Sequence, residues 1–366
     1  EDKRNRLILP GVELIKKLKP DWFILENVIN MQNTVIRNEN DEPEKILDMM
    51  SRILSGEYCI KSSPLEFARY GVPQFRKRLV TIGCSLDKIK LLDESPETIY
   101  SSEKSFLHPE YNRKKLITLR QTIGDLTKHN LDGQNKLASA TNPLHRIPEM
   151  NPEHYHLISK TPEGETAFNN LTCNHCSHYH DPTKMTDQER RLQTKCDNCD
   201  EFLDVPKIKV KEWICAKCSK FNGKFKRKCQ KKNCNHSRNG VKSKVFWRTI
   251  SGFMTSYRRM SWDKPANTIT TTSHNFTSDG KGHPEEHRVF SIEEILRGST
   301  IIPSPEVKVP WNHNYRFEFR NKNDELYTPK KEVDSIIREV VGESIPPLAM
   351  HTILKHIQSL EKKYAD

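Results

Sequence analysis

Residues 20–32 read Pro-Asp-Trp-Phe-Ile-Leu-Glu-Asn-Val-Ile-Asn-Met-Gln, and this stretch decides the expected fold. Its apolar run, Trp22–Leu25, is typical of a buried strand in a parallel sheet. Glu26 and Asn27 follow the run directly, at the sheet edge where α/β proteins place their ligands. A helical apolar pattern precedes the strand over residues 11–19 and stops at Pro20. The stretch therefore predicts an αβ unit with an acid and an amide at a site position.

A second run, Gly-Val-Pro-Gln-Phe-Arg-Lys-Arg at residues 71–78, leads into an apolar stretch at residues 79–83. If the whole run is a strand, its side chains alternate between the two faces of the sheet. Gln74, Arg76 and Arg78 then share one face at the start of that strand. We expect Glu26 to meet both arginines there. Taken alone, the run would be explained equally well by ordinary surface arginines on an edge strand.

The two runs resemble motifs of the 5-cytosine DNA methyltransferases, whose Glu-Asn-Val and Gln-x-Arg-x-Arg sequences correspond to residues 26–28 and 74–78. Further blocks match the family in the same order along the chain. They are Thr118–Leu126, Pro265–Thr271, His283–Ser291 and Gly342–Leu348. The similarity thus runs nearly end to end, apart from a central insertion.

The resemblance implies methyl transfer from S-adenosylmethionine to carbon 5 of a cytosine flipped out of double-stranded DNA. Glu26 would then contact nitrogen 3 and the 4-amino group of the cytosine, and Arg78 its 2-oxo group. Arg76 would contact a phosphate or Glu26, and Gln74 belongs to the same motif. Asn27 would hold the nucleophile loop.

The resemblance also assigns residues outside these two runs. Thr268 matches the position where the recognition region meets the target phosphate, and Leu7, Ser344 and Ile345 match positions that line the S-adenosylmethionine pocket.

Two motifs of the family are missing from the sequence, the glycine-rich cofactor loop and the Pro-Cys-Gln loop that carries the nucleophilic cysteine. Both normally precede the Glu-Asn-Val strand. We therefore interpret the chain as the C-terminal part of a methyltransferase, either a fragment or the second subunit of a split enzyme. A second polypeptide or a missing N-terminal half would supply the nucleophile and cofactor loop, and this chain alone would be inactive.

The 366 residues carry a formal net charge of +12, and the excess lies in one segment. Between Lys207 and Arg248, fifteen lysines and arginines accompany a single acid, Glu212. Such a patch favours nucleic acid, although a solvated charged face is the alternative. We assign Lys224, Lys226 and Arg227 to DNA binding. No apolar run is long enough to span a membrane, so we expect a soluble protein, cytoplasmic and nucleoid-associated or, in a eukaryote, nuclear.

Eight of the ten cysteines form CxxC-like pairs with the spacing of structural zinc sites. Each set offers four thiolates and leaves no open position for water, which argues against catalytic zinc. Disulfides, or a histidine from residues 175, 178 and 180 in place of one cysteine, are the alternatives. Cys59 and Cys84 are expected to be core thiols. The two predicted zinc sites consist of Cys173, Cys176, Cys196 and Cys199, and of Cys215, Cys218, Cys229 and Cys234.

The expected fold class is α/β, the C-terminal part of a doubly wound methyltransferase sheet with a mixed target-recognition domain. Residues 1–113 would be the C-terminal half of the catalytic domain, and residues 114–290 the recognition domain, with zinc modules at about 170–204 and 211–238. Residues 291–366 would return to the catalytic domain and end in a closing helix that begins near Pro346 and Pro347.

Two other functions fit parts of the sequence. A non-catalytic DNA-binding specificity protein derived from such an enzyme would keep the recognition region without the chemistry. Trp213 and Asn222 lie before and after the first cysteine pair of the second set, Cys215 and Cys218. They resemble the Ran-binding-protein type of zinc finger, which elsewhere binds single-stranded RNA or ubiquitin. A binding module directed at RNA or protein is therefore a third possibility.

Overall fold

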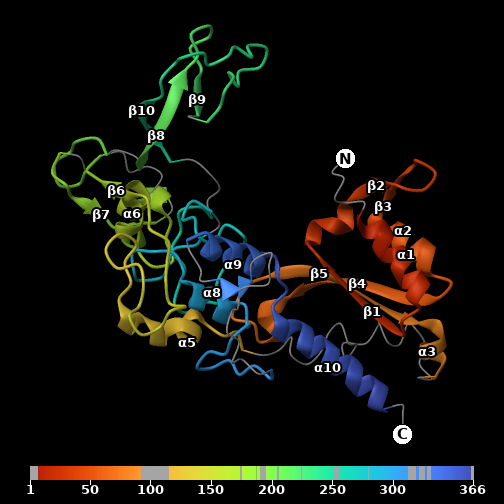
Figure 1. Cartoon of the computed structure of the whole chain (residues 1–366). Helices are drawn as coiled ribbons and strands as arrows, with labels where there is room; N and C mark the ends of the chain where they lie inside the picture. The colour runs from red at the N-terminus through yellow and green to blue at the C-terminus, as the bar shows by residue number, and fades with distance from the viewer. Residues whose placement is uncertain are drawn as a thin grey trace.

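The chain folds into two lobes with a ribbon that projects from one of them (Figure 1). The computed structural model describes residues 7–91, 115–173, 175–186, 188–189, 195–203, 206–223, 225–250, 255–278, 280–311, 319–320, 326–327 and 331–363. The first lobe holds the Glu-Asn-Val strand, and the second holds most of the remaining helices.

The sheet of the first lobe has three strands in the order β1-β5-β4, where β1 is Trp22–Asn27, β4 is Tyr58–Glu66 and β5 is Lys77–Ser85. Both pairings are antiparallel, with Glu26 opposite Val80 and Leu65 opposite Arg78. The prediction of parallel pairing is therefore wrong for the strands that the structure describes. A short connection from β4 to β5 turns the chain back on itself, which gives antiparallel neighbours, and β1 then joins the free edge of β5.

Helices cover both faces of this sheet, because β5 is apolar on both sides. Alternate residues Val80, Ile82 and Cys84 pack against α10, Pro347–Lys363. On the other face, Leu79 and Phe23 belong to the core that α1, Ile8–Leu18, and α2, Ile46–Leu54, complete. This layering is that of a mixed α/β protein.

Gly83 makes the packing of the Phe23 ring possible. A Cβ atom at Gly83 would lie 2.1 Å from Cε1 of Phe23, so a larger residue would displace the ring from the sheet. The ring also meets Tyr58 edge to face, with centroids 5.3 Å apart.

Short elements complete the first lobe. They are η2 Ile29–Asn33, the hairpin of β2 Val35–Arg37 and β3 Pro43–Lys45, η3 Phe67–Tyr70 and α3 Leu86–Leu91. The strand β3 leads directly into α2, which begins at Ile46.

The second lobe is built around α5 Leu119–Ile123, α8 Ile292–Gly298 and α9 Lys331–Glu343, which share one apolar core. Both α5 and α8 begin with a capping box, formed by Thr118 with Gln121 and by Ser291 with Glu294. Of the segment predicted to return to the catalytic domain, α10 packs on the sheet, whereas α8 and α9 pack with α5. Further helices of this lobe are η5 Gly124–His129, α6 Pro152–Ser159, η6 Ala167–Asn169 and η7 Pro182–Lys184.

Both cysteine-rich segments contain small antiparallel sheets. The first pairs β6 Leu171–Thr172 with β7 Tyr179–His180. The second is the projecting ribbon of Figure 1, with strand order β10-β8-β9, where β8 is Lys207–Ile214, β9 is Phe221–Gly223 and β10 is Lys244–Thr249. A further pair, β11 Phe319–Arg320 and β12 Leu326–Tyr327, precedes α9.

Candidate functional site

Glu26 and Arg78 form an ion pair where β1 ends and β5 begins. Glu26 lies opposite Val80 in the strand register, so its side chain and that of Arg78 are diagonal neighbours on the face covered by α10. Oε1 of Glu26 is 2.8 Å from Nε of Arg78, and the two side chains are 14% and 15% exposed. The pair is therefore sheltered but accessible, and it offers a carboxylate and a guanidinium side by side.

Asn27 ends β1 next to this pair. Its side chain is exposed, and Oδ1 accepts a hydrogen bond from the backbone N–H of Val28 at 2.8 Å. The side-chain oxygen of Asn27 is therefore occupied by the backbone.

Gln74 does not point into the same site. It is fully buried before β5 begins, where Oε1 accepts a hydrogen bond from the Ile269 N–H at 2.9 Å and Nε2 donates to the Gly298 carbonyl at 3.2 Å. Gln74 thus joins the start of β5 to the end of the predicted recognition region and to α8.

Arg76 makes a second set of bonds at this place. Its guanidinium donates to the carbonyls of Ile269 at 3.1 Å, Gly342 at 3.1 Å and Ser344 at 2.9 Å. Burial, together with the neighbouring charge of Arg78, lowers the pKa of Arg76 to about 10. Arg76 therefore ties residues 269, 342 and 344 together.

Thr268 lies in the same contact. Its hydroxyl donates to the Phe75 carbonyl at 2.7 Å, while backbone bonds join Phe75 N to Ala266 O at 2.8 Å and Ala266 N to Pro73 O at 3.0 Å. We call residues 73–76 and 266–269, with the carbonyls of 298, 342 and 344, the junction. It connects the two lobes of the chain.

The expectation that an acid and two arginines converge therefore needs correction. Arg78 meets Glu26, whereas the Arg76 guanidinium is occupied by three backbone carbonyls. Strand alternation had been assumed from Gln74 onward, but β5 begins at Lys77, and the preceding residues bond to the junction instead.

The three residues predicted for the cofactor come from two parts of the chain, Leu7 before α1 and Ser344 with Ile345 between α9 and α10. Leu7 is 71% exposed beside the start of α1. The groups of Ser344 all have partners within the protein, since its N–H donates to Val340 O, its hydroxyl to Val341 O, and its carbonyl accepts from Arg76. Ile345 packs on the core beneath α10. These residues alone do not fit S-adenosylmethionine, the cofactor of the family that the motifs resemble, and we assign them no step in the chemistry.

Both predicted cysteine sets come together in space. In each set, all four Sγ atoms lie within 4.8 Å of one another. Cys173 and Cys199, Cys176 and Cys196, and Cys218 and Cys229 have their sulfurs 3.5 Å apart, and Cys215 and Cys234 3.8 Å. A tetrahedral zinc with bonds of about 2.3 Å has sulfur–sulfur edges of about 3.8 Å, so both sets fit this ion.

The structure argues against disulfide bonds and against a histidine ligand in these two sets. All ten cysteines are free, and the separations within each set far exceed the roughly 2 Å of a disulfide bond. In the part of the chain that the structure describes, the clusters able to hold a metal contain cysteine alone, so no histidine replaces a thiolate.

Cys59 and Cys84 are opposite one another in β4 and β5. Burial raises the pKa of Cys84 to about 12, which keeps this thiol protonated and unreactive. Cys84 also lies opposite Trp22, four residues along β1 from Glu26, or roughly 13 Å in an extended strand. Neither cysteine is placed to attack a base held by Glu26.

Two of the three cations predicted to bind DNA lie in the second cysteine-rich segment. Lys226 and Arg227 are exposed, and the backbone carbonyl of Lys226 accepts a hydrogen bond from Nε1 of the buried Trp213 at 2.8 Å. Lys224 lies outside the described residues.

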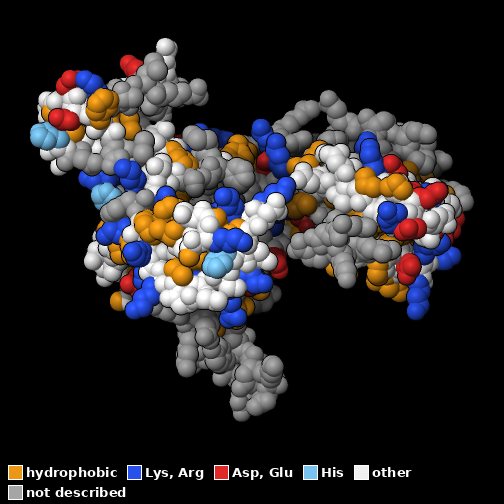
Figure 2. Space-filling view, turned by 90° about the horizontal axis from the view of Figure 1, so that it is seen from above, with side chains coloured by type: hydrophobic (Ala, Val, Ile, Leu, Met, Phe, Trp, Pro, Cys, Tyr) orange, Lys and Arg blue, Asp and Glu red, His pale blue; other side chains and the backbone are white. Residues whose placement is uncertain are grey.

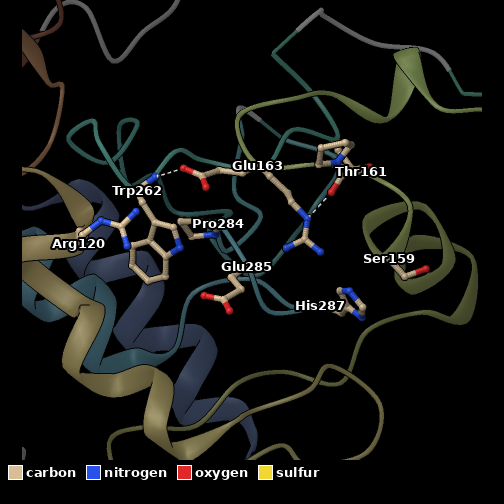
Figure 3. Close-up of a pocket in the computed structure, with 10 residues that line it drawn as sticks. Arg120, Ser159, Thr161, Glu163, Trp262, Pro284, Glu285 and His287 are labelled. Atoms are coloured by element: carbon tan, nitrogen blue, oxygen red, sulfur yellow. Dashed lines mark hydrogen bonds between the residues drawn. The ribbon is translucent and has the colours of Figure 1, made fainter. Parts of the chain in front are cut away.

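An open hollow of about 470 Å³ lies on the second lobe, lined in part by Arg120, Glu163, Trp262 and Glu285 (Figure 3). The carboxylate of Glu163 accepts a hydrogen bond from the Trp262 N–H at 2.7 Å, and the Arg120 guanidinium lies 5.4 Å from the centre of the Trp262 ring. Side chains of both charges line the hollow, with Arg120 and Arg259 on the positive side and Glu163 and Glu285 on the negative.

Two residues that support the junction, Glu66 and Gly342, received no individual role from the sequence. The Glu66 carboxylate accepts the backbone N–H of Arg76 at 2.7 Å and so fixes the start of β5. Gly342 packs against the backbone of Thr270 and Thr271, where a Cβ atom would lie 2.2 Å from the Thr271 nitrogen. Gly342 belongs to the last block that matches the family, and a glycine there could have indicated close packing. The sequence around Glu66 contains no comparable indication of its hydrogen bond.

The helices that the structure describes include none with the length and apolar character needed to cross a membrane.

Comparison with known proteins gives a consistent result. The family model of C-5 cytosine-specific DNA methylases matches residues 1–359. The type II methyltransferase M1.HgaI of Avibacterium volantium is 22% identical over 365 residues, which cover 97% of this chain and 71% of that protein. M.AgeI of Thalassovita gelatinovora is 21% identical, covering 81% and 69% respectively. M1.HphI of Haemophilus parahaemolyticus is 30% identical over 137 residues, 37% of this chain and 31% of that protein. With a family model that spans almost the whole sequence and the Glu26–Arg78 pair at adjoining strand ends, the chain belongs to the C-5 cytosine-specific DNA methylase family.

Proposed function

We propose that the chain provides the cytosine-binding and DNA-recognition parts of a DNA 5-cytosine methyltransferase. The observation that carries the proposal is the pairing of Glu26 with Arg78 at the ends of two adjacent strands. A carboxylate can accept a hydrogen bond from the 4-amino group or share a proton with nitrogen 3, and a guanidinium can donate to the 2-oxo group. These groups lie along one edge of cytosine, and the paired side chains complement it.

Both side chains also have a chemical role in this proposal. Addition of a nucleophile at carbon 6 places negative charge on the ring, and Glu26 would relieve it by supplying a proton at nitrogen 3. Arg78 would stabilise the charge that develops on the 2-oxo oxygen. Asn27 would hold the segment that bears the nucleophile, and Thr268 would contact the phosphate beside the target.

The nucleophile is proposed to come from outside the present sequence. All ten cysteines are accounted for by the two zinc-fitting clusters and by Cys59 and Cys84, which lie away from Glu26. A second polypeptide segment with the Pro-Cys-Gln motif and the cofactor loop would complete the site and bind S-adenosylmethionine, which supplies the methyl group.

The second candidate function is a non-catalytic DNA-binding protein derived from such an enzyme. The positions of the cysteines favour it, since none of the ten thiols lies beside Glu26. In that case the junction and the zinc-fitting modules would still serve DNA recognition, and the Glu26–Arg78 pair would have only a structural effect.

One experiment separates these functions. The chain is mixed with a polypeptide that carries the Pro-Cys-Gln motif, cytosine-containing duplex DNA and methyl-labelled cofactor. We expect label in the DNA only when both polypeptides are present, and its loss when the cysteine of the motif is replaced by serine. Absence of label with retained duplex binding would reject the enzyme and leave the second candidate.

A further inference from the structure

The ribbon formed by β8, β9 and β10 has two faces of different character. Opposed residues in the register share a face, which places Lys207, Lys209 and Lys211 of β8 opposite Thr249, Trp247 and Val245 of β10. We call this the lysine face. Figure 2 looks down on the side from which the ribbon projects and shows many Lys and Arg side chains there.

On the opposite face of the ribbon, Arg248 and Glu212 form an ion pair. Arg248 bonds through Nε to Glu212 at 2.9 Å, and its guanidinium lies 4.1 Å from the centre of the Phe221 ring. Phe221 in turn meets Phe246 edge to face at 4.9 Å. Glu212 is the one acid between Lys207 and Arg248. It pairs with Arg248 on this face and not on the lysine face.

The three lysines are regularly spaced on a rigid support. Residues two apart on a strand are separated by about 6.7 Å, so the row repeats with the strand. Lys209 and Lys211 are exposed and Lys207 is half-buried. The strand is held by the buried Trp213, which packs with Cys215 and Cys229 of the second cysteine cluster.

We infer that the lysine face binds the sugar-phosphate backbone of duplex DNA without reading its sequence, an inference that rests on the DNA-recognition role in the proposed function. A straight row of like charges complements the repeated charge of a nucleic-acid strand. The chain belongs to a DNA methylase family, so DNA is the polyanion expected at this row of charges. Backbone contacts of this kind position a protein on DNA and do not specify a base.

The inference predicts a change in the salt dependence of DNA binding. Each neutralised phosphate contributes about 0.9 to the slope of log K against log salt concentration, so the triple variant K207Q/K209Q/K211Q should lose about 2 to 3 from that slope. Its loss of affinity between 50 and 200 mM NaCl should then be smaller than that of the unaltered chain by up to about 40-fold. The matched control is K16Q/K17Q/K19Q, which removes the same charge from α1 and its C-terminal cap and should leave the slope unchanged.

The measurement uses the full chain and fluorescence anisotropy of a labelled duplex of random sequence. Circular dichroism and zinc content check that the variants remain folded. An unchanged slope for the ribbon variant, or an equal change in the control, would overturn the inference. So would a loss confined to single-stranded DNA, or tighter binding of poly-glutamate than of duplex. Methyl transfer in the complemented enzyme, measured separately at low salt, reports on the proposed function alone.

Discussion

Removal of the Arg76 guanidinium should destabilise the contact between the two lobes. Arg76 is 2% exposed, and its side chain bonds to three carbonyls in two distant parts of the chain, Ile269 in one and Gly342 with Ser344 in the other. Replacement by methionine, Arg76→Met, retains much of the aliphatic stem and leaves these carbonyls without their donor.

The magnitude follows from the burial of these groups. Hydrogen bonds from a charged donor contribute about 1.5 to 3 kcal/mol each, and two of the three are fully buried. The cost of burying the guanidinium, which also lowers its pKa to about 10, offsets part of this contribution. We expect a net loss of about 3 kcal/mol in the free energy of unfolding. Arg76→Lys should recover less than half, since one ammonium cannot span three carbonyls.

The assay is urea unfolding followed by circular dichroism, with Arg69→Met as the control, because Arg69 is exposed on η3 in the same lobe. The control should change the free energy of unfolding by less than about 0.5 kcal/mol. A loss below about 1 kcal/mol for Arg76→Met, or an equal loss in the control, would refute the structural role assigned to Arg76.

Three further outcomes are expected. Gly342→Ala should lower the free energy of unfolding by about 1 to 3 kcal/mol because its Cβ meets backbone at 2.2 Å, while Gly56→Ala, with nothing within 4 Å, should be near neutral in the same urea assay; equal effects would contradict the packing. Burial lowers the pKa of His145 from 6.5 to about 4, so the unfolded chain binds the proton more readily and stability should fall by up to about 3 kcal/mol as pH drops from 6.5 to 4. Unfolding at several pH values should show a weaker dependence in His145→Gln, and an identical dependence would reject this role. Elemental analysis should find two zinc ions per chain, and their removal by a chelator should make the ribbon of residues 207–249 sensitive to protease; a zinc content near zero would reject both sites.

Local sequence patterns predicted the elements that carry the site. The apolar run before Glu26 is a strand, and the closing helix begins at Pro347 and packs on the sheet, as expected from its apolar face. The cysteine spacing also predicted both clusters, because a turn of fixed length brings each CxxC pair of thiols to one point.

Features that depend on distant contacts could not be predicted in this way. The direction of strand pairing depends on which edge of β5 was open to β1, and no pattern in residues 20–32 contains that information. Gln74 and Arg76 lie only a few residues before Arg78, yet their partners are at residues 269, 298, 342 and 344. A motif shows which residues occur together in sequence, whereas burial decides that two of them bond to backbone carbonyls and one faces Glu26.

The measurement that tests the central claim most directly is the rate of methyl transfer by Arg78→Ala in the complemented enzyme, with Arg69→Ala as the matched control. If Arg78 stabilises charge on the target base, the rate should fall by about 100 to 1,000-fold. The dissociation constant for duplex DNA should change by less than about threefold in the same variant, and the control should leave both quantities unchanged. Equal losses in rate and in DNA binding, or an unchanged rate, would contradict the claim that Glu26 and Arg78 bind the cytosine.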